Sequence, residues 1–299
     1  GVTSANERIP RMSSPHDEET ADQKMDAPPP ASPDLHPWRR YVALGDSFTE
    51  GVGDPEPSLP GGNRGWADRV AEVLSQSAPD FAYANLAVRG KLIEQIMAEQ
   101  LDTAVALKPD LVTISAGGND VIRPGTDPDA IALRFEDAIA RLSGSGATVV
   151  VFTGVDVGFS PVFRRLRGKV AIYNENVRAI AEKYDAIVAD MWALKEVQDS
   201  RFWADDRLHP NALGHHEIAR MVLRGLNVDA ALRPLQPGPL PLITWRQART
   251  EDLVWAREFL VPWVLRRIRH ESSGDAITAK RPEPGPFGVL PGTTSGDAG

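Results

Sequence analysis

The chain has 299 residues, of which 42% are hydrophobic and 25% charged, a composition typical of a globular protein with a buried core. Its formal net charge of −8 argues against nucleic acid as the main partner, because binding to phosphates requires a basic surface. It contains no cysteine, which excludes disulfides, thiolate metal sites and cysteine nucleophiles.

Both ends of the sequence have the composition of disordered segments. Residues 1–36 are rich in Ser, Pro, Asp and Glu, and residues 272–299 are rich in Gly, Pro, Ser, Thr and Ala. Between them we expect one folded domain over residues 37–230 and a helical extension over residues 231–271. Residues 1–36 also lack an apolar run of the signal-peptide kind, so we expect a cytoplasmic protein.

Short β-branched runs alternate with longer helical patterns across the central region. Strands are predicted at residues 41–44, 81–88, 111–115, 148–153 and 186–189, and helices at residues 66–75, 91–107, 130–142, 169–183 and 211–226. Several strands are apolar on both faces, which is typical of a parallel sheet covered by helices on both sides. The pattern predicts an α/β fold, a three-layer α/β/α sandwich with a five-stranded parallel sheet.

Residues with catalytic potential follow several of these strands. Ser47 follows the first strand, Gly90 the second and Asn119 the third, while Asp206 and His209 follow the fifth and precede the last helix of the domain. Open α/β sheets bind ligands in the crevice outside the carboxyl ends of their strands. We therefore expect these residues to converge at one edge of the sheet.

A serine, a histidine and an aspartate are the residues required for nucleophilic acyl transfer. His209 can take the proton of the Ser47 hydroxyl and return it to the leaving group, and a carboxylate can hold its other ring N–H. Asp205 and Asp206 are both candidates for that carboxylate. The alternative is a structural role, in which Ser47 is a helix N-cap and the Asp–His pair lies in a surface turn.

Three further donors can stabilise the oxyanion that forms during acyl transfer. The side-chain amide of Asn119 and the backbone N–H groups of Ser47 and Gly90 would together form an oxyanion hole. Gly90 also lets a substrate approach the backbone closely, although a glycine at a helix start is equally common without a function.

These motifs together resemble the SGNH, or GDSL-type, hydrolases. The matching stretches are Gly45-Asp46-Ser47, Asn85-Leu86-Ala87-Val88-Arg89-Gly90, Gly117-Gly118-Asn119-Asp120 and Asp206-Arg207-Leu208-His209-Pro210. The resemblance covers roughly residues 40–227 and implies a flavodoxin-like fold, with Ser47 as nucleophile, Gly90 and Asn119 as oxyanion donors, and Asp206 rather than Asp205 as the partner of His209. Phe48 stands where the family has leucine, a position we interpret as apolar packing.

The expected function is that of a serine esterase, which hydrolyses a small-molecule carboxylic ester through an acyl-enzyme on Ser47. No metal and no organic cofactor are expected. Two alternatives stay open: transfer of the acyl group to an alcohol or sugar by the same residues, and a non-catalytic binding module on the same scaffold.

Two other residue patterns do not support a phosphate-binding loop or a metal site. The glycines of residues 51–65 are not followed by the lysine and serine or threonine of a phosphate-binding loop. His209, His215, His216 and Glu217 have metal-ligand side chains but not the spacing of a zinc site.

Residues 244–270 predict one more helix. Thr244 and Gln247 form a capping-box pattern at its start. Four apolar residues lie on one face of this helix: Leu253, Ala256, Leu260 and Val264. Pro262 is expected to kink it. The helix either packs on the catalytic domain through this face or lies, with its many arginines, as a weak contact on a membrane surface.

Overall fold

The computed structural model describes residues 36–228, 232–269, 271–272 and 274–287. The disorder predicted for residues 1–36 therefore lies outside the described residues, apart from His36, which is buried. The same holds for the part of the predicted tail beyond residue 287.

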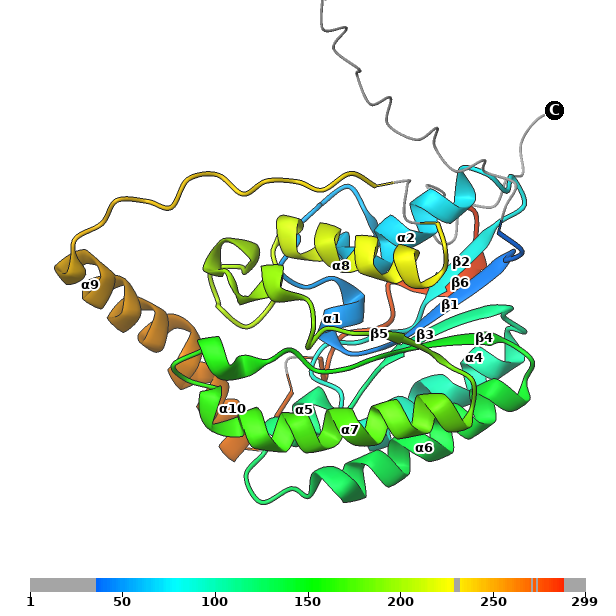
Figure 1. Ribbon diagram of the computed structural model, residues 1–299, viewed down its shortest axis with the longest axis horizontal. Helices are drawn as coiled ribbons and strands as arrows, with labels where there is room; N and C mark the ends of the chain where they lie inside the picture. Colours follow the sequence, from blue (N-terminus) through cyan, green and yellow to red (C-terminus); the bar gives the residue numbers. More distant parts are fainter. Residues whose placement is uncertain (1–35, 229–231, 270, 273, 288–299) are drawn as a thin grey trace, which may run out of the picture.

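The centre of the domain is a six-stranded sheet in the order β5-β4-β3-β1-β2-β6. Its first five strands in the chain are parallel: β1 (Arg40–Gly45), β2 (Ala82–Asn85), β3 (Leu111–Ser115), β4 (Thr148–Phe152) and β5 (Ile187–Ala189). These are the five predicted strands, and Figure 1 shows helices on both faces of the sheet. The predicted α/β/α sandwich is confirmed, with one strand more than expected.

Helices cover the two faces because alternate residues of each strand point to opposite sides. Tyr41 and Ala43 of β1 pack with α2 (Gly65–Ser75) and α8 (Ala212–Gly225). Val42 and Leu44 face the other core. The helices of that side are α3 (Ile93–Ile96), α4 (Asp102–Ala106), α6 (Pro128–Gly144) and α7 (Arg167–Lys183).

Short helical turns occupy the connections. Two one-turn α-helices follow β1 and β3, namely α1 (Ser47–Glu50) and α5 (Gly118–Ile122). The 3₁₀ turns are η2 (Pro60–Gly62), η4 (Val157–Phe159), η5 (Arg164–Leu166), η6 (Lys195–Gln198) and η7 (Ser200–Phe202).

The helix predicted over residues 91–107 is interrupted by a π-helical turn, η3 (Met97–Leu101), between α3 and α4. This turn contains Gln100, which is buried. Its side-chain amide donates to the carbonyl of Gly45 and its oxygen accepts from the N–H of Gly45, both at 2.9 Å. Gln100 thus satisfies both backbone groups of the last residue of β1, directly before Asp46 and Ser47.

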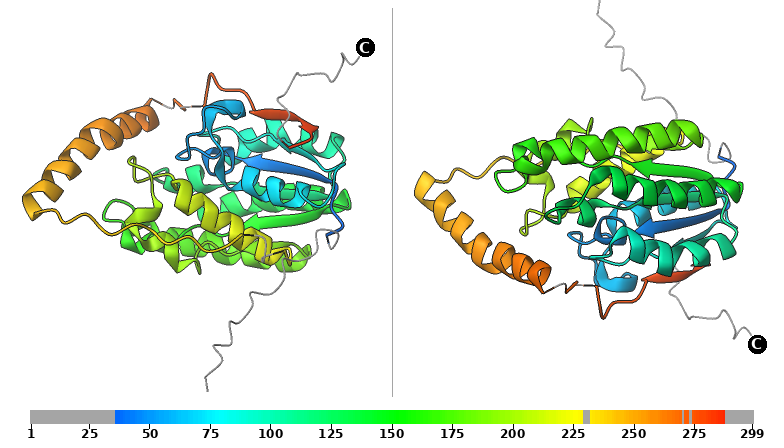
Figure 2. Two further views of the ribbon diagram at one scale, coloured as in Figure 1. Left: turned by 90° about the horizontal axis from the view of Figure 1, so that it is seen from above. Right: turned by 90° about the horizontal axis from the view of Figure 1, so that it is seen from below.

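The segment at residues 245–268, which we call the arm, is one long bent helix. It consists of α9 (Trp245–Trp255), a π-helical turn η9 (Ala256–Leu260) and α10 (Val261–Ile268). Figures 1 and 2 show the arm at the end of the domain where β1 leads into α1. No helix among the described residues combines the length and the apolar character needed to cross a bilayer.

The capping box of the arm is present, but only part of the predicted apolar face points toward the domain. Thr244 caps α9, and its side chain accepts from the N–H of Gln247. Leu253 and Val264 of that face are exposed, whereas Ala256 and Leu260 are partly buried, as are Trp255 and Trp263. The π-helical turn inserts an extra residue and so rotates the face that points to the domain.

Residues 274–287 differ from the predicted disordered tail. Strand β6 (Arg281–Gly285) pairs antiparallel with β2 at the edge of the sheet. The preceding Lys280 is buried, and its Nζ lies 3.1 Å from Asp68 Oδ1 of α2 and donates to the carbonyls of Asn63 and Arg64. A composition rich in proline and glycine favours disorder, but here one buried ion pair and an edge strand hold the segment on the domain.

Candidate active site

Ser47 is the first residue of the one-turn helix α1, directly after the end of β1. Gly45 has a φ of +150°, and a Cβ there would lie 2.6 Å from the carbonyl oxygen of Ser115. Asp46 then caps α1, with its carboxylate accepting from the N–H of Phe48 at 3.2 Å. The N-cap is therefore Asp46 and not Ser47, so the serine hydroxyl is left free for another partner.

That partner is His209, whose Nε2 lies 3.0 Å from Ser47 Oγ. The Nδ1 of the same ring lies 2.6 Å from Asp206 Oδ2. Asp205 is exposed and forms no side-chain hydrogen bond or ion pair within the described part of the chain. The structure thus brings three of the residues singled out from the sequence, Ser47, His209 and Asp206, into one hydrogen-bonded line.

A tight turn before α8 holds Asp206 and His209 together. The Oδ1 of Asp206 accepts from the backbone N–H groups of Leu208 and His209, at 2.9 and 3.0 Å. Arg207 adopts the left-handed region, with a φ of +57°, which is uncommon for a residue with a side chain. A backbone strained in this way persists because the Asp206 carboxylate and the surrounding contacts hold it.

The two carboxylates at the site have opposite pKa shifts. Burial by itself would raise the pKa of Asp206, but the hydrogen bond and charge of His209 and the two backbone N–H groups outweigh burial, so the pKa lies below its usual value. Burial raises the pKa of Asp46 to about 6, against the opposing hydrogen bond from Phe48. Asp206 is thus held ionised beside the imidazole, where it favours the ring orientation that faces Ser47.

Asn119 lies in the first turn of α5 and lines the same cavity as Ser47. Its Nδ2 lies 3.1 Å from the carbonyl of Lys91 and 3.3 Å from Asp46 Oδ2. Gly90 has a φ of +76° in the turn after β2 and immediately precedes Lys91. It is therefore next to the residue that holds Asn119, but it is not among the residues that line the cavity.

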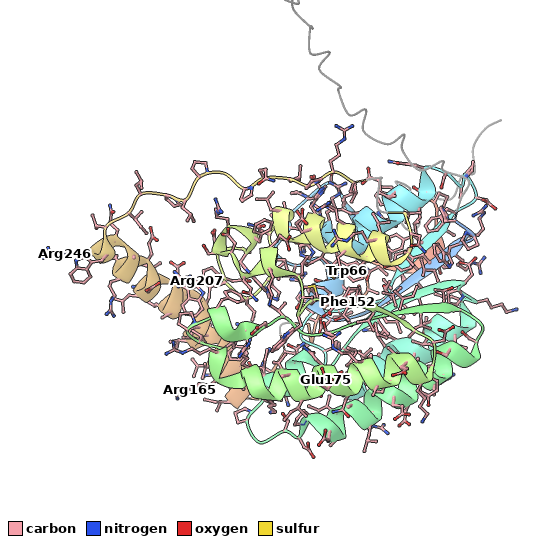
Figure 3. The ribbon with its side chains drawn as sticks, in the orientation of Figure 1. Trp66, Phe152, Arg165, Glu175, Arg207 and Arg246 are labelled. Atoms are coloured by element: carbon pink, nitrogen blue, oxygen red, sulfur yellow. The ribbon has the colours of Figure 1, made fainter. Side chains whose placement is uncertain are left out.

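The cavity beside Ser47 has a volume of about 250 Å³ and a largely apolar wall. We call this space the acyl-side cavity. It is lined by apolar side chains from α5, α7, β4 and the turns after β4, among them Val121, Ile122, Phe152, Val155, Phe163, Leu166 and Val170. Phe152 packs against Phe48 and Trp66, with ring centroids 5.4 and 4.8 Å away, and Figure 3 shows Trp66 and Phe152 in the interior of the domain. The predicted packing role of Phe48 agrees with these contacts.

A second cavity of about 140 Å³ lies on the other side of His209, between the arm and the turn that holds Asp206 and His209. Trp255 of the arm donates its indole N–H to the backbone carbonyl of Asp206 at 2.7 Å. Arg207 lies over the Trp255 ring at 4.9 Å and pairs with Asp252 at 2.8 Å, beside the arm in Figure 3. Sequence reasoning missed these contacts, although the tryptophans of residues 244–270 were an available signal.

His215, which the sequence places near metal-ligand residue types, has a structural role instead. Its Nδ1 accepts from the N–H of Trp66 and its Nε2 donates to the carbonyl of Val52, both at 3.1 Å. Burial lowers its pKa to about 4, so the ring is neutral. Across the described residues, no group of histidine and acidic side chains is arranged to hold a metal ion.

Comparison with known proteins links this geometry to one family. The sequence model of the GDSL-like lipase/acylhydrolase family matches residues 43–217. An acetylxylan esterase of Geobacillus stearothermophilus is 26% identical over 209 residues, which are 64% of this chain and 94% of that protein.

Solved structures show the same fold. The crystal structure of LAE5, an alpha/beta hydrolase enzyme from the metagenome of Lake Arreo, Spain, has a TM-score of 0.55 at 23% identity and covers 64% of this chain and 96% of its own. That of Axe2, an acetylxylan esterase from Geobacillus stearothermophilus, has a TM-score of 0.54 at 22% identity and covers 66% of this chain and 97% of its own. The arm begins beyond the end of the family match at residue 217.

Proposed function

The chain belongs to the GDSL-like lipase/acylhydrolase family and is a carboxylic ester hydrolase, and we propose that it cleaves esters through an acyl-enzyme on Ser47. The observation that carries the proposal is the line of hydrogen bonds from Ser47 through His209 to Asp206, at 3.0 and 2.6 Å. Distances of this size are those over which a general base takes a proton from a nucleophile.

The proposed reaction has two halves. Ser47 Oγ attacks the carbonyl carbon of the ester while its proton passes to His209 Nε2. The ester C–O bond then breaks, and the same proton passes to the oxygen of the departing alcohol. In the second half, a water molecule gives a proton to His209 and attacks the acyl-enzyme, which releases the acid and returns the proton to Ser47.

Asn119 is the proposed side-chain donor to the oxyanion, together with the backbone N–H groups of Ser47 and Gly90. Support comes from the place of Asn119 on the wall of the acyl-side cavity, next to Ser47. A donor at this position can stabilise the negative charge that develops on the carbonyl oxygen.

The acyl-side cavity favours an acyl chain longer than acetyl. An acetyl group would leave most of a cavity of about 250 Å³ unfilled, whereas each methylene group buried against its apolar wall would contribute about 0.8 kcal/mol. We therefore infer that the preferred substrates are esters of medium-length acids, rather than the acetyl esters suggested by the name of the acetylxylan esterase.

Labelling with a fluorophosphonate, followed by peptide mapping, tests the acyl-enzyme directly. We expect modification of Ser47 alone, and a loss of kcat of at least about ten-thousand-fold in Ser47→Ala with native circular dichroism. Labelling at another serine, or turnover that survives in Ser47→Ala, would refute the proposal. Product analysis with an added alcohol would show whether water or the alcohol receives the acyl group.

A further inference from the structure

Exposed apolar side chains are concentrated on one segment of the chain. Of the 17 large apolar side chains that are exposed among the described residues, 11 belong to residues 240–268, which comprise the arm and the end of the segment that leads to it. Single exposed apolar residues are normal on a protein surface. A group of this size on one element instead marks a surface that binds a partner.

Part of this group forms a stripe along the outer side of the arm. The stripe consists of Leu253, Val261, Leu265 and Ile268, which are 43% to 72% exposed. Residues four apart in an α-helix drift by about 40° around its axis, and the extra residue of the π-helical turn η9 offsets this drift between Leu253 and Val261. The stripe therefore stays on the side of the arm away from the partly buried Trp255 and Trp263. Figure 2 shows the arm as the outermost element at this end of the domain.

The tip of the arm, at residues 240–246, is apolar as well. Leu242 is fully exposed there, and so is most of Trp245, with the guanidinium of Arg246 over its ring at 5.9 Å. Figure 3 shows Arg246 at the end of the arm that lies farthest from the sheet. A tryptophan beside an arginine suits a membrane interface, where the indole ring lies at the level of the headgroups and the guanidinium reaches their phosphates.

The charge around the stripe is positive, although the whole chain has a net charge of −8. Residues 240–269 contain six arginines and three acidic residues, a difference of +3. Three exposed arginines lie seven and four residues before Leu253 and four residues after it, and so share its side of the helix: Arg246, Arg249 and Arg257.

The acidic residues of the arm lie on its other side. Glu251, Asp252 and Glu258 are four and three residues before Trp255 and three residues after it, so they share the side that is turned toward the domain. Asp252 pairs with Arg207 of the domain, and Glu258 lines the second cavity. The outer side of the arm thus combines apolar side chains with cationic ones.

We propose that the outer side of the arm docks on an anionic lipid bilayer, with the stripe and the tip among the headgroups and the arginines at the phosphates. The 24 residues of the arm span about 36 Å along the helix, but the stripe is only one helix wide. A fluid lipid surface accepts such a long and narrow apolar edge, whereas a protein partner needs a matching groove. The arm lies in the plane of this surface and does not cross it.

Docking through the arm places the active site close to the lipid. The arm is joined to the turn that holds Asp206 and His209 by the hydrogen bond from Trp255 to the carbonyl of Asp206. That turn is then about one helix diameter from the headgroups, roughly 10 Å. Docking itself involves no residue of the proposed reaction, so the two can be tested separately.

Flotation with vesicles tests the docking without any ester. The probes are vesicles of phosphatidylcholine with an equal amount of phosphatidylglycerol, and vesicles of phosphatidylcholine alone. We expect binding to the anionic vesicles to be at least about tenfold stronger, since each arginine near an anionic surface contributes about fivefold. Ser47→Ala should float like the wild type.

Leu253→Glu places a carboxylate in the stripe and should weaken binding to the anionic vesicles by at least about tenfold. Leu133→Glu is the matched control, because Leu133 is exposed to a similar degree on α6, outside the arm, and gains the same charge. Its binding should stay within about twofold of the wild type. Circular dichroism and hydrolysis of a water-soluble ester should be unchanged in both variants.

A second pair of variants tests the charge. Arg246→Gln with Arg249→Gln should weaken binding to the anionic vesicles by at least about tenfold. Arg141→Gln with Arg224→Gln removes the same charge from exposed positions on α6 and α8 and should bind within about twofold of the wild type.

Three outcomes would overturn the proposal. The first is that the wild type fails to float, or binds both kinds of vesicle equally. The second is that Leu253→Glu binds as well as Leu133→Glu. The third is that light scattering without lipid finds a wild-type dimer that Leu253→Glu converts to a monomer, which would make the stripe an interface between two copies of the chain.

Discussion

The indole N–H of Trp255 donates to the backbone carbonyl of Asp206 at 2.7 Å, so the arm contacts the residue that orients His209. The neighbouring Arg207 is stacked on the same indole and paired with Asp252. The arm, which lies beyond the residues matched by the family model, thus contacts the turn that carries His209 and Asp206. The position of Asp206, and with it that of His209, therefore involves the arm as well as the sheet.

Trp255→Phe is expected to lower kcat about three- to tenfold with little change in KM. The substitution keeps an aromatic ring but removes one neutral hydrogen bond to the backbone carbonyl of Asp206. The measurement is steady-state kinetics with a neutral ester. Trp245→Phe is the control, because Trp245 lies at the start of the arm and is 71% exposed. An equal loss in both variants, or a change confined to KM, would contradict a positioning role for Trp255.

Asn119→Ala tests the oxyanion donor. Loss of one such donor typically lowers kcat by about a hundred- to a thousandfold while KM changes little, because the interaction strengthens in the transition state. Asn176→Ala, at a partly exposed position on α7 that does not line the cavity, should behave like the wild type. A rise in KM at constant kcat would show that Asn119 binds the ground state instead.

Ile122→Trp tests the assignment of the acyl-side cavity. Ile122 lies at the end of α5 and lines this cavity, so a larger side chain should shorten the space for the acyl chain. We expect the kcat/KM for an octanoyl ester, relative to an acetyl ester, to fall by about tenfold or more. Leu133→Trp, on the exposed side of α6, should leave this ratio unchanged.

The convergence of the proposed catalytic residues at one edge of the sheet could be predicted, because each of them follows a parallel strand. In a parallel sheet the carboxyl ends of the strands share one edge, so residues that follow β1, β3 and β5 must lie near one another. Ser47 and Asn119 meet this condition because they follow β1 and β3 within a few residues, whereas the place of His209 also depends on the turns that lie between it and β5. The choice of Asp206 over Asp205 came from the family resemblance, and the hydrogen bonds of the turn supply its physical reason.

The features that were missed depend on contacts between distant segments. Gln100 reaches Gly45 only because a π-helical turn redirects it, and a regular helical period does not reveal such a turn. The apolar face of the arm was predicted only in part, for the same reason, at η9. The antiparallel strand β6 was missed because its composition favours disorder, and its attachment depends on Lys280 and its partner Asp68, more than 200 residues earlier in the chain.

Lys280→Met is expected to destabilise the protein by roughly 3–5 kcal/mol, because it leaves the buried carboxylate of Asp68 without its counter-charge. Urea unfolding measures the difference. Lys108→Met removes the same charge from an exposed position and should change stability by less than about 0.5 kcal/mol. The double variant Asp68→Asn, Lys280→Met should recover part of the loss, and no recovery would argue against an ion pair as the cause.

His215 predicts how stability depends on pH. It lies fully buried between the N–H of Trp66 and the carbonyl of Val52, and burial lowers its pKa from 6.5 to about 4. Between these two values the unfolded chain binds a proton at this residue and the folded chain does not. The free energy of unfolding must therefore fall as the pH drops from 6.5 toward 4.

The expected size of this fall follows from about 1.36 kcal/mol per pKa unit, which gives on the order of 3 kcal/mol for the shift at His215. His215→Gln is expected to be less stable at neutral pH, since it disturbs two buried hydrogen bonds, but to lose this part of the acid dependence. His216→Gln, at the next position on α8, should retain the wild-type slope. Urea unfolding from pH 7 to pH 4.5 measures all three proteins, and identical slopes for His215→Gln and the wild type would show that other groups cause the acid sensitivity.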